Sequence, residues 1–197
     1  LHAGIDPESF PFPFHQSMDS DEQAAIANQI RTGFNTPKTS SIGRLFDGVA
    51  ALIGLHQQIS YEAQNAIALE TIVDPQEKSA YDFPIENGLI LVSPMIREVV
   101  RDLEQHTAPA LISARFHNGL TACAVRVCEE IRAKTGLRQV ALSGGVWQNK
   151  TLIKQTITAL SKSGFEVFFP RTLPTNDGGV SLGQALAALA VSGNLKE

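Results

Sequence analysis

The stretch that decides the fold is residues 140–149, which read Val140-Ala141-Leu142-Ser143-Gly144-Gly145-Val146-Trp147-Gln148-Asn149. An apolar segment typical of a buried strand leads into a pair of glycines, and a helical pattern follows almost at once. Because Gly144 and Gly145 carry no side chains, a ligand could approach the backbone, and the N–H groups of the turn could face an anion. The stretch is therefore typical of a nucleotide site in an α/β protein, and a simple tight turn is the alternative.

The elements around this stretch alternate between strand and helix. We expect a strand at 138–143, a helix at about 147–163, a strand at 165–169 and a helix at about 178–191. This order predicts an α/β fold with a small parallel or mixed sheet that many helices cover. The first 135 residues read as mostly helical, with helices at about 19–33, 40–54, 62–73 and 108–134, another that begins at Ser93-Pro94, and one strand at 89–92. We expect these helices to form layers around the sheet.

Two regions are expected from the pattern: residues 1–34, an extended Pro- and Phe-rich lead-in followed by a helix, and residues 35–197, a nucleotide-binding lobe. The chain has 197 residues and begins with Leu1 rather than Met, so we expect it to be a piece of a longer protein. Its net charge of -4 argues against a nucleic acid or an anionic membrane as the main partner. No transmembrane run or secretory signal is visible in it. Cys123 and Cys128 read as small buried hydrophobic residues, and a reducing cytoplasm is the expected compartment.

A second glycine-rich turn, Asn176-Asp177-Gly178-Gly179, follows the last expected strand. A carboxylate at the carboxyl end of a strand can ligate a metal ion, and an Asx-type turn with Asp177 as helix N-cap is the alternative. Because both turns follow consecutive strands, they should lie side by side at one edge of the sheet. Together they predict a site for a nucleotide and a metal ion.

Asp47 is a carboxylate on an otherwise apolar helix face, beside Phe46 and Val49. It could form an ion pair with Arg44, three residues earlier, or accept hydrogen bonds from ribose hydroxyls. His117 lies next to the apolar stripe of the long helix and is typical of a structural histidine. The sequence contains no P-loop, nucleophile elbow or paired-histidine metal motif.

Five blocks of sequence, in this order, resemble the C-terminal part of the hydrogenase-maturation carbamoyltransferases of the HypF family. They are Thr39–Leu52, Tyr61–Gln64, Phe116–Asn118, Leu142–Asn149 and Pro174–Gly179. The resemblance implies an actin-like fold of the sugar kinase/Hsp70 type, which this family shares with the threonylcarbamoyladenosine-forming enzymes of tRNA modification.

The resemblance also implies an activity. Members of the family use carbamoyl phosphate and ATP to form carbamoyl-adenylate in an interdomain cleft. They then pass the carbamoyl group to the C-terminal cysteine of a partner protein, HypE, where it becomes the cyanide ligand of [NiFe] hydrogenase. Two alternatives remain: a non-catalytic module that binds a nucleotide or a partner protein, and an O-carbamoyltransferase of small molecules built on the same lobe.

Carried over by position, the resemblance assigns roles to particular residues. Gly144 and Gly145 would approach the nucleotide phosphates, and Asn149 would form a hydrogen bond with the nucleotide. Asp47 would hold the ribose, and Asp177 would be one ligand of a divalent metal ion.

The chain departs from the family pattern in the helix that begins near residue 62. Gln64 stands where the tRNA-modifying relatives have a glycine that contacts the nucleotide, so we count it among the nucleotide-binding residues. The family usually has glycine in place of Ala63 and commonly alanine in place of Asn65. The family's His-rich metal motif and its acylphosphatase-like and zinc-binding modules would belong to N-terminal domains that precede this chain.

Overall fold

The computed structural model describes residues 3–5 and 17–193, so most of the expected lead-in at 1–17 lies outside the described residues. The contacts of the chain divide it into two compact units, Leu1–Leu120 and Thr121–Glu197. This division falls inside the longest helix, and the boundary expected after residue 34 stays an untested prediction.

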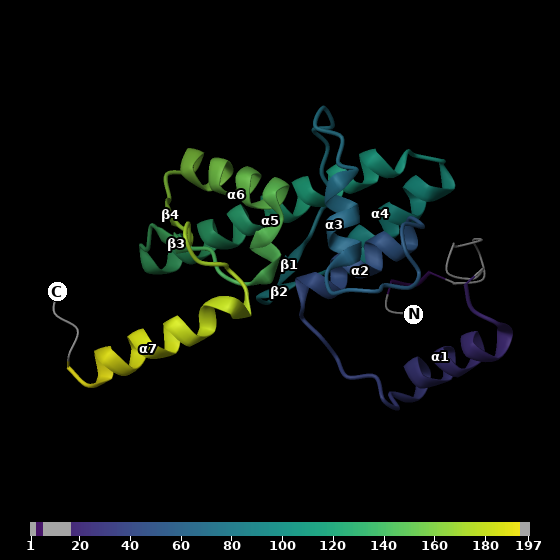
Figure 1. Ribbon diagram of the computed structural model, residues 1–197. Coiled ribbons are helices and arrows are strands. Elements are labelled where there is room, and N and C mark those ends of the chain that lie inside the picture. The colour runs from purple at the N-terminus through teal and green to yellow at the C-terminus, as the bar shows by residue number, and fades with distance from the viewer. Residues whose placement is uncertain (1–2, 6–16, 194–197) are drawn as a thin grey trace. The chain divides into compact units, whose positions relative to one another are not determined.

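The first unit is mostly helical, as the sequence predicts (Figure 1). Two of its helices begin at residues that cap them: Asp19 and Glu22 form a capping box at the first helix, and the Ser41 side chain accepts a hydrogen bond from the Arg44 N–H at the second. Its elements are α1 (Ser20–Thr32), α2 (Ile42–Leu52), α3 (Gln64–Thr71), β1 (Ile85–Glu86), β2 (Leu89–Ile90), α4 (Ser93–Glu104) and the first part of α5 (Pro109–Thr135).

A short antiparallel hairpin interrupts the helices. Its two strands pair Ile85 with Ile90, while Asn87 and Gly88 form the turn with φ values of 51° and 78°. Both values lie in the left-handed region that a two-residue type I′ turn requires, and Asn-Gly is its preferred sequence. A single strand is expected at 89–92 from the sequence pattern. Its partner strand was not predicted, although the Asn-Gly turn signals it.

An aromatic cluster forms the core of this unit. Phe46 on α2 packs edge-on against Phe116 on α5, with ring centroids 4.9 Å apart, and Phe83 lies 6.3 Å from Phe116. His117 is completely buried beside them, and its Nδ1 lies 2.8 Å from the carbonyl oxygen of Ser113. Burial lowers the pKa of His117, which favours the neutral ring. His117 is therefore a structural histidine, as its sequence context indicates.

A charged cluster fixes the segment before the hairpin to α4 and α5. The Arg115 guanidinium donates hydrogen bonds to both carboxylate oxygens of Asp102, at 2.9 and 2.8 Å, and to Glu77 at 3.1 Å. Tyr81 donates its hydroxyl to the same Asp102 carboxylate. Hydrogen bonds from Ser79, with a further contribution from Arg115, lower the pKa of Glu77 to about 2. These residues are distant in sequence, so the cluster stabilises tertiary rather than local structure.

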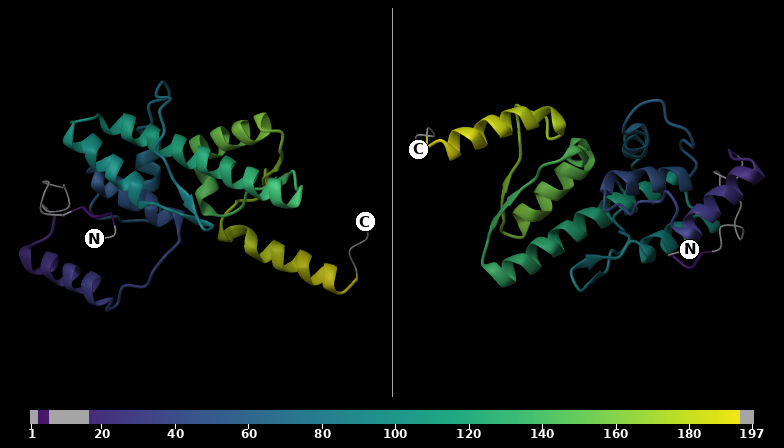
Figure 2. Two further views of the ribbon diagram at one scale, coloured as in Figure 1. Left: turned by 180° about the vertical axis from the view of Figure 1, so that it is seen from behind. Right: turned by 90° about the horizontal axis from the view of Figure 1, so that it is seen from below.

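The second unit has the strand–helix–strand–helix order that the sequence predicts (Figure 2). Two parallel strands pair Val140 with Val167, and an α-helix connects them. After the last part of α5, its elements are β3 (Gln139–Ala141), the 3-10 helix η3 (Gly145–Gln148), α6 (Lys150–Lys162), β4 (Glu166–Phe168), the 3-10 helix η4 (Asp177–Gly179) and α7 (Val180–Val191).

One face of this sheet is covered. Leu142, Leu160 and Phe165 are buried, and side chains from α5, α6 and η3 pack against them. Phe168 points to the other face and is 48% exposed. The helices that precede residue 109 pack around an aromatic core in the first unit. Their expected arrangement in layers around the sheet stays a prediction. No helix in residues 3–5 and 17–193 is long and apolar enough to cross a membrane.

Candidate nucleotide-binding site

The two glycine-rich turns of the second unit lie side by side, as the order of the strands predicts. The N–H of Gly144 donates a hydrogen bond to the carbonyl oxygen of Thr175 at 2.8 Å. A Cβ placed on Gly145 would lie 3.9 Å from the Cβ of Asn176. Gly144 has φ 105° and ψ 160°, a conformation open only to glycine. The first turn therefore needs this glycine for its shape as well as for access to the backbone.

The first turn leads into η3, which begins at Gly145. The N–H groups of Gly145 and Val146 open this helix and therefore have no acceptor within it. The Gly144 N–H, in contrast, is already bound to Thr175. The capacity of the turn to bind an anion thus lies in Gly145 and Val146, while Gly144 shapes the turn.

The second turn exposes a carboxylate. Asn176, and not Asp177, caps η4, because its side-chain oxygen accepts a hydrogen bond from the Gly178 N–H at 3.1 Å. The alternative in which Asp177 is the cap is therefore wrong. The Asp177 carboxylate is exposed and has no hydrogen-bond or ion-pair partner among the residues that the structure describes.

Asp177 could hold a metal ion only together with other ligands. The described residues contain no group of three or more His, Cys, Asp or Glu side chains that could bind a metal. A single unpaired carboxylate fits one ligand position of a hard divalent cation, with water or phosphate oxygens in the others.

Asn149 caps the helix that follows the first turn. Its side-chain oxygen accepts a hydrogen bond from the Leu152 N–H at 2.8 Å, and the residue is 9% exposed. This capping role is enough to explain why an asparagine stands at the start of α6, and no contact with a ligand is needed to account for it. The expected hydrogen bond from Asn149 to a nucleotide stays a prediction.

The two other predicted residues, Asp47 and Gln64, belong to the first unit. Asp47 lies on α2 and forms an ion pair with Arg44, with 3.2 Å between Nη2 and Oδ2. Gln64 begins α3, and its side-chain oxygen accepts hydrogen bonds from the backbone N–H and the hydroxyl of Ser60, at 2.8 and 3.2 Å. The structure thus explains both residues by local contacts, and their roles toward a nucleotide stay predictions.

Backbone strain precedes Gln64. Ala63 has φ 62°, in the left-handed region that costs a non-glycine residue about 1 kcal/mol or more. The next residue but one, Asn65, is buried and donates a hydrogen bond from its side chain to the carbonyl oxygen of His56. Both departures from the family pattern therefore occur at the start of α3.

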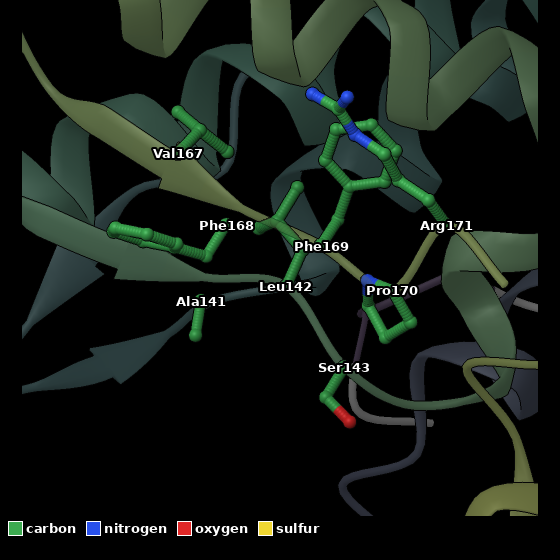
Figure 3. Close-up of a pocket in the computed structure, with 8 residues that line it drawn as sticks. All are labelled: Ala141, Leu142, Ser143, Val167, Phe168, Phe169, Pro170 and Arg171. Atoms are coloured by element: carbon green, nitrogen blue, oxygen red, sulfur yellow. The ribbon is translucent and has the colours of Figure 1, made fainter. Parts of the chain in front are cut away.

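A cavity of about 530 Å³ opens beside the carboxyl ends of β3 and β4 (Figure 3). Ser143, next to the first glycine turn, lines this cavity, and so does the half-exposed ring of Phe168. Arg171, which was not predicted from the sequence, also lines the cavity, and its guanidinium lies 5.5 Å from the Phe169 ring centroid. Its position just after β4, where ligands bind in open α/β sheets, is the signal that could have identified it.

Comparisons with known proteins show the family. Residues 6–184 match the family model described as the second subdomain of the carbamoyltransferase Kae1-like domain. The carbamoyltransferase HypF of Synechocystis sp. is 40% identical over 159 residues, which are 78% of this chain and 20% of that protein.

Two solved structures share the fold. The crystal structure of full-length HypF in the phosphate- and nucleotide-bound form matches 90% of this chain and 24% of that chain, with a TM-score of 0.84 and 38% identity. The crystal structure of T. kodakarensis HypF matches 95% of this chain and 25% of that chain, with a TM-score of 0.79 and 28% identity.

These matches confirm the predicted fold class, a helix-rich α/β lobe of the actin-like type. The chain spans about a fifth to a quarter of the length of these relatives. The chain therefore belongs to the HypF family of carbamoyltransferases, and it corresponds to the second subdomain of the Kae1-like domain.

Proposed function

We propose that this chain is the nucleotide-binding part of a carbamoyltransferase that uses carbamoyl phosphate and ATP. In this proposal the enzyme forms carbamoyl-adenylate and transfers the carbamoyl group to the C-terminal cysteine of a HypE-like partner during [NiFe] hydrogenase maturation. N-terminal domains of the longer protein supply the remainder of the active site. The observation that carries the proposal is the Gly144–Thr175 hydrogen bond, which joins a turn suited to phosphate with a turn that exposes a carboxylate.

The backbone of the first turn binds the phosphates. The N–H groups of Gly145 and Val146 donate to phosphate oxygens, and the glycine at 144 keeps the approach free of side chains. Asp177 holds a divalent metal ion, which neutralises the charge of the phosphates when it is bound. Together these groups orient the mixed anhydride for attack by the acceptor thiol.

The proposal assigns the ribose to Asp47. Its Oδ2 lies 3.2 Å from Arg44 Nη2 but accepts no hydrogen bond among the described residues, so the carboxylate keeps the capacity to accept one from a ribose hydroxyl. Gln64 and Asn149 contribute to nucleotide binding by holding nearby backbone in place. The Gln64 side chain holds the loop at Ser60, and the Asn149 side chain holds the start of α6.

Calorimetric titration of this chain with ATP, with and without Mg²⁺, tests the phosphate and metal roles. We expect ATP binding that Mg²⁺ strengthens, and we expect Asp177→Ala to remove the effect of Mg²⁺ while the fold stays intact. Glu130→Ala, which removes an exposed carboxylate from α5 in the same unit, is the matched control and should change nothing. If Asp177→Ala binds ATP and Mg²⁺ as the unmodified chain does, Asp177 is not a metal ligand.

The same substitution in the full-length protein tests the reaction. We expect Asp177→Ala to abolish carbamoyl transfer from carbamoyl phosphate to a HypE-like acceptor. If the unmodified full-length protein binds the nucleotide but transfers no carbamoyl group, the result favours a non-catalytic module.

Two substitutions at Asn149 separate its cap from a nucleotide contact. Asn149→Ala should lower stability by about 1 kcal/mol through loss of the cap. If Asn149 also contacts the nucleotide, the same change weakens binding by about 1–3 kcal/mol. Asn149→Ser keeps a cap-forming oxygen but removes the amide, so it should restore stability and leave the affinity low. If Asn149→Ser binds the nucleotide as tightly as the unmodified chain, Asn149 acts only as a helix cap.

A further inference from the structure

The side chain of Thr175 has no hydrogen-bond partner. Its hydroxyl oxygen is buried, and no other residue that the structure describes donates a hydrogen bond to it or accepts one from it. The buried side-chain oxygens of Asp47 and Asn65 that also lack a partner belong to the first unit, and each is part of a group with a second polar atom. Thr175 has a single polar side-chain atom, so its whole polar group stays unbonded. Buried polar groups are nearly always paired in native proteins, so this one needs an explanation.

Thr175 lies at the contact between the two glycine-rich turns. Its carbonyl oxygen accepts the hydrogen bond from the Gly144 N–H at 2.8 Å, so its backbone is fixed directly beside the first turn. The N–H groups of Gly145 and Val146 follow Gly144 in the chain, and the Asp177 carboxylate follows Thr175 by two residues. The unpaired hydroxyl therefore belongs to the same small region as the groups to which the proposed function assigns the phosphates and the metal ion.

An unpaired hydroxyl is costly in the free protein. Burial takes the hydroxyl out of bulk water, and no protein group replaces the hydrogen bonds that water would make. A valine has nearly the same shape and no polar atom, so packing alone does not explain the threonine. The turn does not explain it either, since both residues are β-branched and the bond to Gly144 uses the main-chain carbonyl. The hydroxyl is therefore best explained by a partner that comes from outside the chain.

Thr175 can present this hydroxyl to a ligand. The residue as a whole is only partly buried, and a rotation to another staggered position about its Cα–Cβ bond moves the hydroxyl out of its buried place. A hydroxyl can donate one hydrogen bond, and an anionic oxygen is the acceptor with which that bond is strongest. The phosphate oxygens that the first turn is suited to bind are acceptors of this kind.

We propose that Thr175 is a further nucleotide-binding residue, whose hydroxyl turns to donate a hydrogen bond to a phosphate oxygen at the first turn. This inference rests on the proposed function, in which the N–H groups of Gly145 and Val146 bind the phosphates. The Thr175 side chain adds a donor from the second turn, so both turns hold the phosphate. Its hydroxyl therefore lowers the stability of the free protein and raises the affinity for the nucleotide.

Thr175→Val distinguishes a ligand-binding hydroxyl from a structural one, because the two roles predict stability changes of opposite sign. Without ligand, this chain carrying Thr175→Val should have a higher thermal midpoint, since the substitution removes an unpaired buried hydroxyl. In the full-length protein, calorimetric titration should show about 10-fold weaker binding of ATP and unchanged binding of adenosine, which has no phosphate. Thr175→Ser keeps the hydroxyl and should keep the affinity for ATP.

Thr172→Val is the matched control, since it makes the same change at an exposed threonine of the same loop, and it should alter neither the midpoint nor the affinity. A lower midpoint in Thr175→Val would show that the hydroxyl is already bonded in the free protein, and would overturn the proposal. Full ATP affinity in Thr175→Val would overturn it too, while the proposed function would stand because the protein still binds ATP.

Carbamoyl phosphate supplies a second phosphate group for the same titration. If Thr175→Val weakens the binding of carbamoyl phosphate and leaves that of ATP unchanged, the hydroxyl serves the other phosphate ligand of the proposed reaction, and its assignment to the nucleotide is wrong. If the unmodified full-length protein binds no ATP, the proposed function fails and this inference fails with it.

Discussion

The aromatic cluster of the first unit and the outer sheet face and last helix of the second unit bury their apolar residues to very different extents. In the first unit, Phe46, Phe83 and Phe116 are each 0–1% exposed, and the neutral His117 is packed among them. In the second unit, Phe168 and the leucines of α7 are almost half exposed, although the candidate phosphate and metal turns lie there. The aromatic cluster of the first unit is therefore fully covered within its own unit, whereas the sheet face at Phe168 and the helix α7 leave apolar side chains in contact with solvent.

The largest expected effect compares two phenylalanines. Phe116→Ala should lower the free energy of unfolding by about 3–5 kcal/mol, because it leaves a cavity beside Phe46 and Phe83. Phe168→Ala should cost less than about 0.5 kcal/mol in this chain, since half of its ring is already in contact with water. Chemical denaturation of the two variants measures both values. Similar costs would show that the sheet face at Phe168 is covered in solution, and would remove the contrast between the units.

A smaller effect is expected from the charged clusters. Arg115→Met should cost about 2–3 kcal/mol, because it leaves the buried Asp102 carboxylate with Tyr81 as its remaining strong donor. Arg44→Met breaks the ion pair with Asp47 on a side chain that is 58% exposed, so it should cost less than about 0.5 kcal/mol. Thermal and chemical denaturation of both variants at low and high salt measures these costs. The cost of Arg44→Met should shrink at high salt, whereas the cost of Arg115→Met should stay nearly the same.

The helix bounds could be predicted from the sequence because the chain marks them with local signals. Asp19 and Ser41 cap helices, and Gly33, Gly136 and Gly164 end elements with positive φ. The closeness of the two glycine-rich turns followed from topology, since the carboxyl ends of neighbouring parallel strands share one edge. These features depend on a few neighbouring residues or on a general rule of chain connection.

Features that depend on distant residues could not be predicted. The cluster of Arg115, Glu77, Tyr81 and Asp102 joins residues up to 38 positions apart, and no spacing rule connects them. Likewise, Asn149 has the pattern of a ligand residue and of a helix cap, and only the 2.8 Å contact with Leu152 shows that it is a cap. The aromatic core of the helical region was not predicted either, because an apolar stripe does not specify which surface it packs against.

A smaller effect of opposite sign is expected at the start of α3. Ala63→Gly should stabilise the chain by about 0.5–1 kcal/mol, because glycine adopts φ 62° without the steric cost that alanine bears. Ala66→Gly, three residues later within the same helix, is the matched control and should destabilise by about 1 kcal/mol. Denaturant midpoints distinguish the two results. Destabilisation by Ala63→Gly would show that residue 63 is helical in solution and that α3 begins earlier.

The smallest expected effect is a pH dependence that arises in the first unit alone. Burial lowers the pKa of His117, against the raising effects of the Ser113 carbonyl oxygen and the Glu70 carboxylate. Below the unfolded-state pKa of about 6.5, the unfolded chain therefore binds more protons at this site than the folded chain. The free energy of unfolding should fall as the pH falls below about 6.5, and this contribution should be constant above about pH 7.5.

Urea denaturation between about pH 5.5 and 7.5 measures this slope, in a range where ordinary carboxylates stay ionised. His117→Gln should unfold more easily at every pH but with a flatter pH dependence, because glutamine does not titrate. His106→Asn is the control: His106 is exposed and has φ 58°, which asparagine tolerates, so this variant should keep the slope. If His106→Asn and His117→Gln flatten the curve equally, the slope does not arise from the aromatic core. The core would then contribute packing alone, and the pH dependence would not distinguish the first unit from the second.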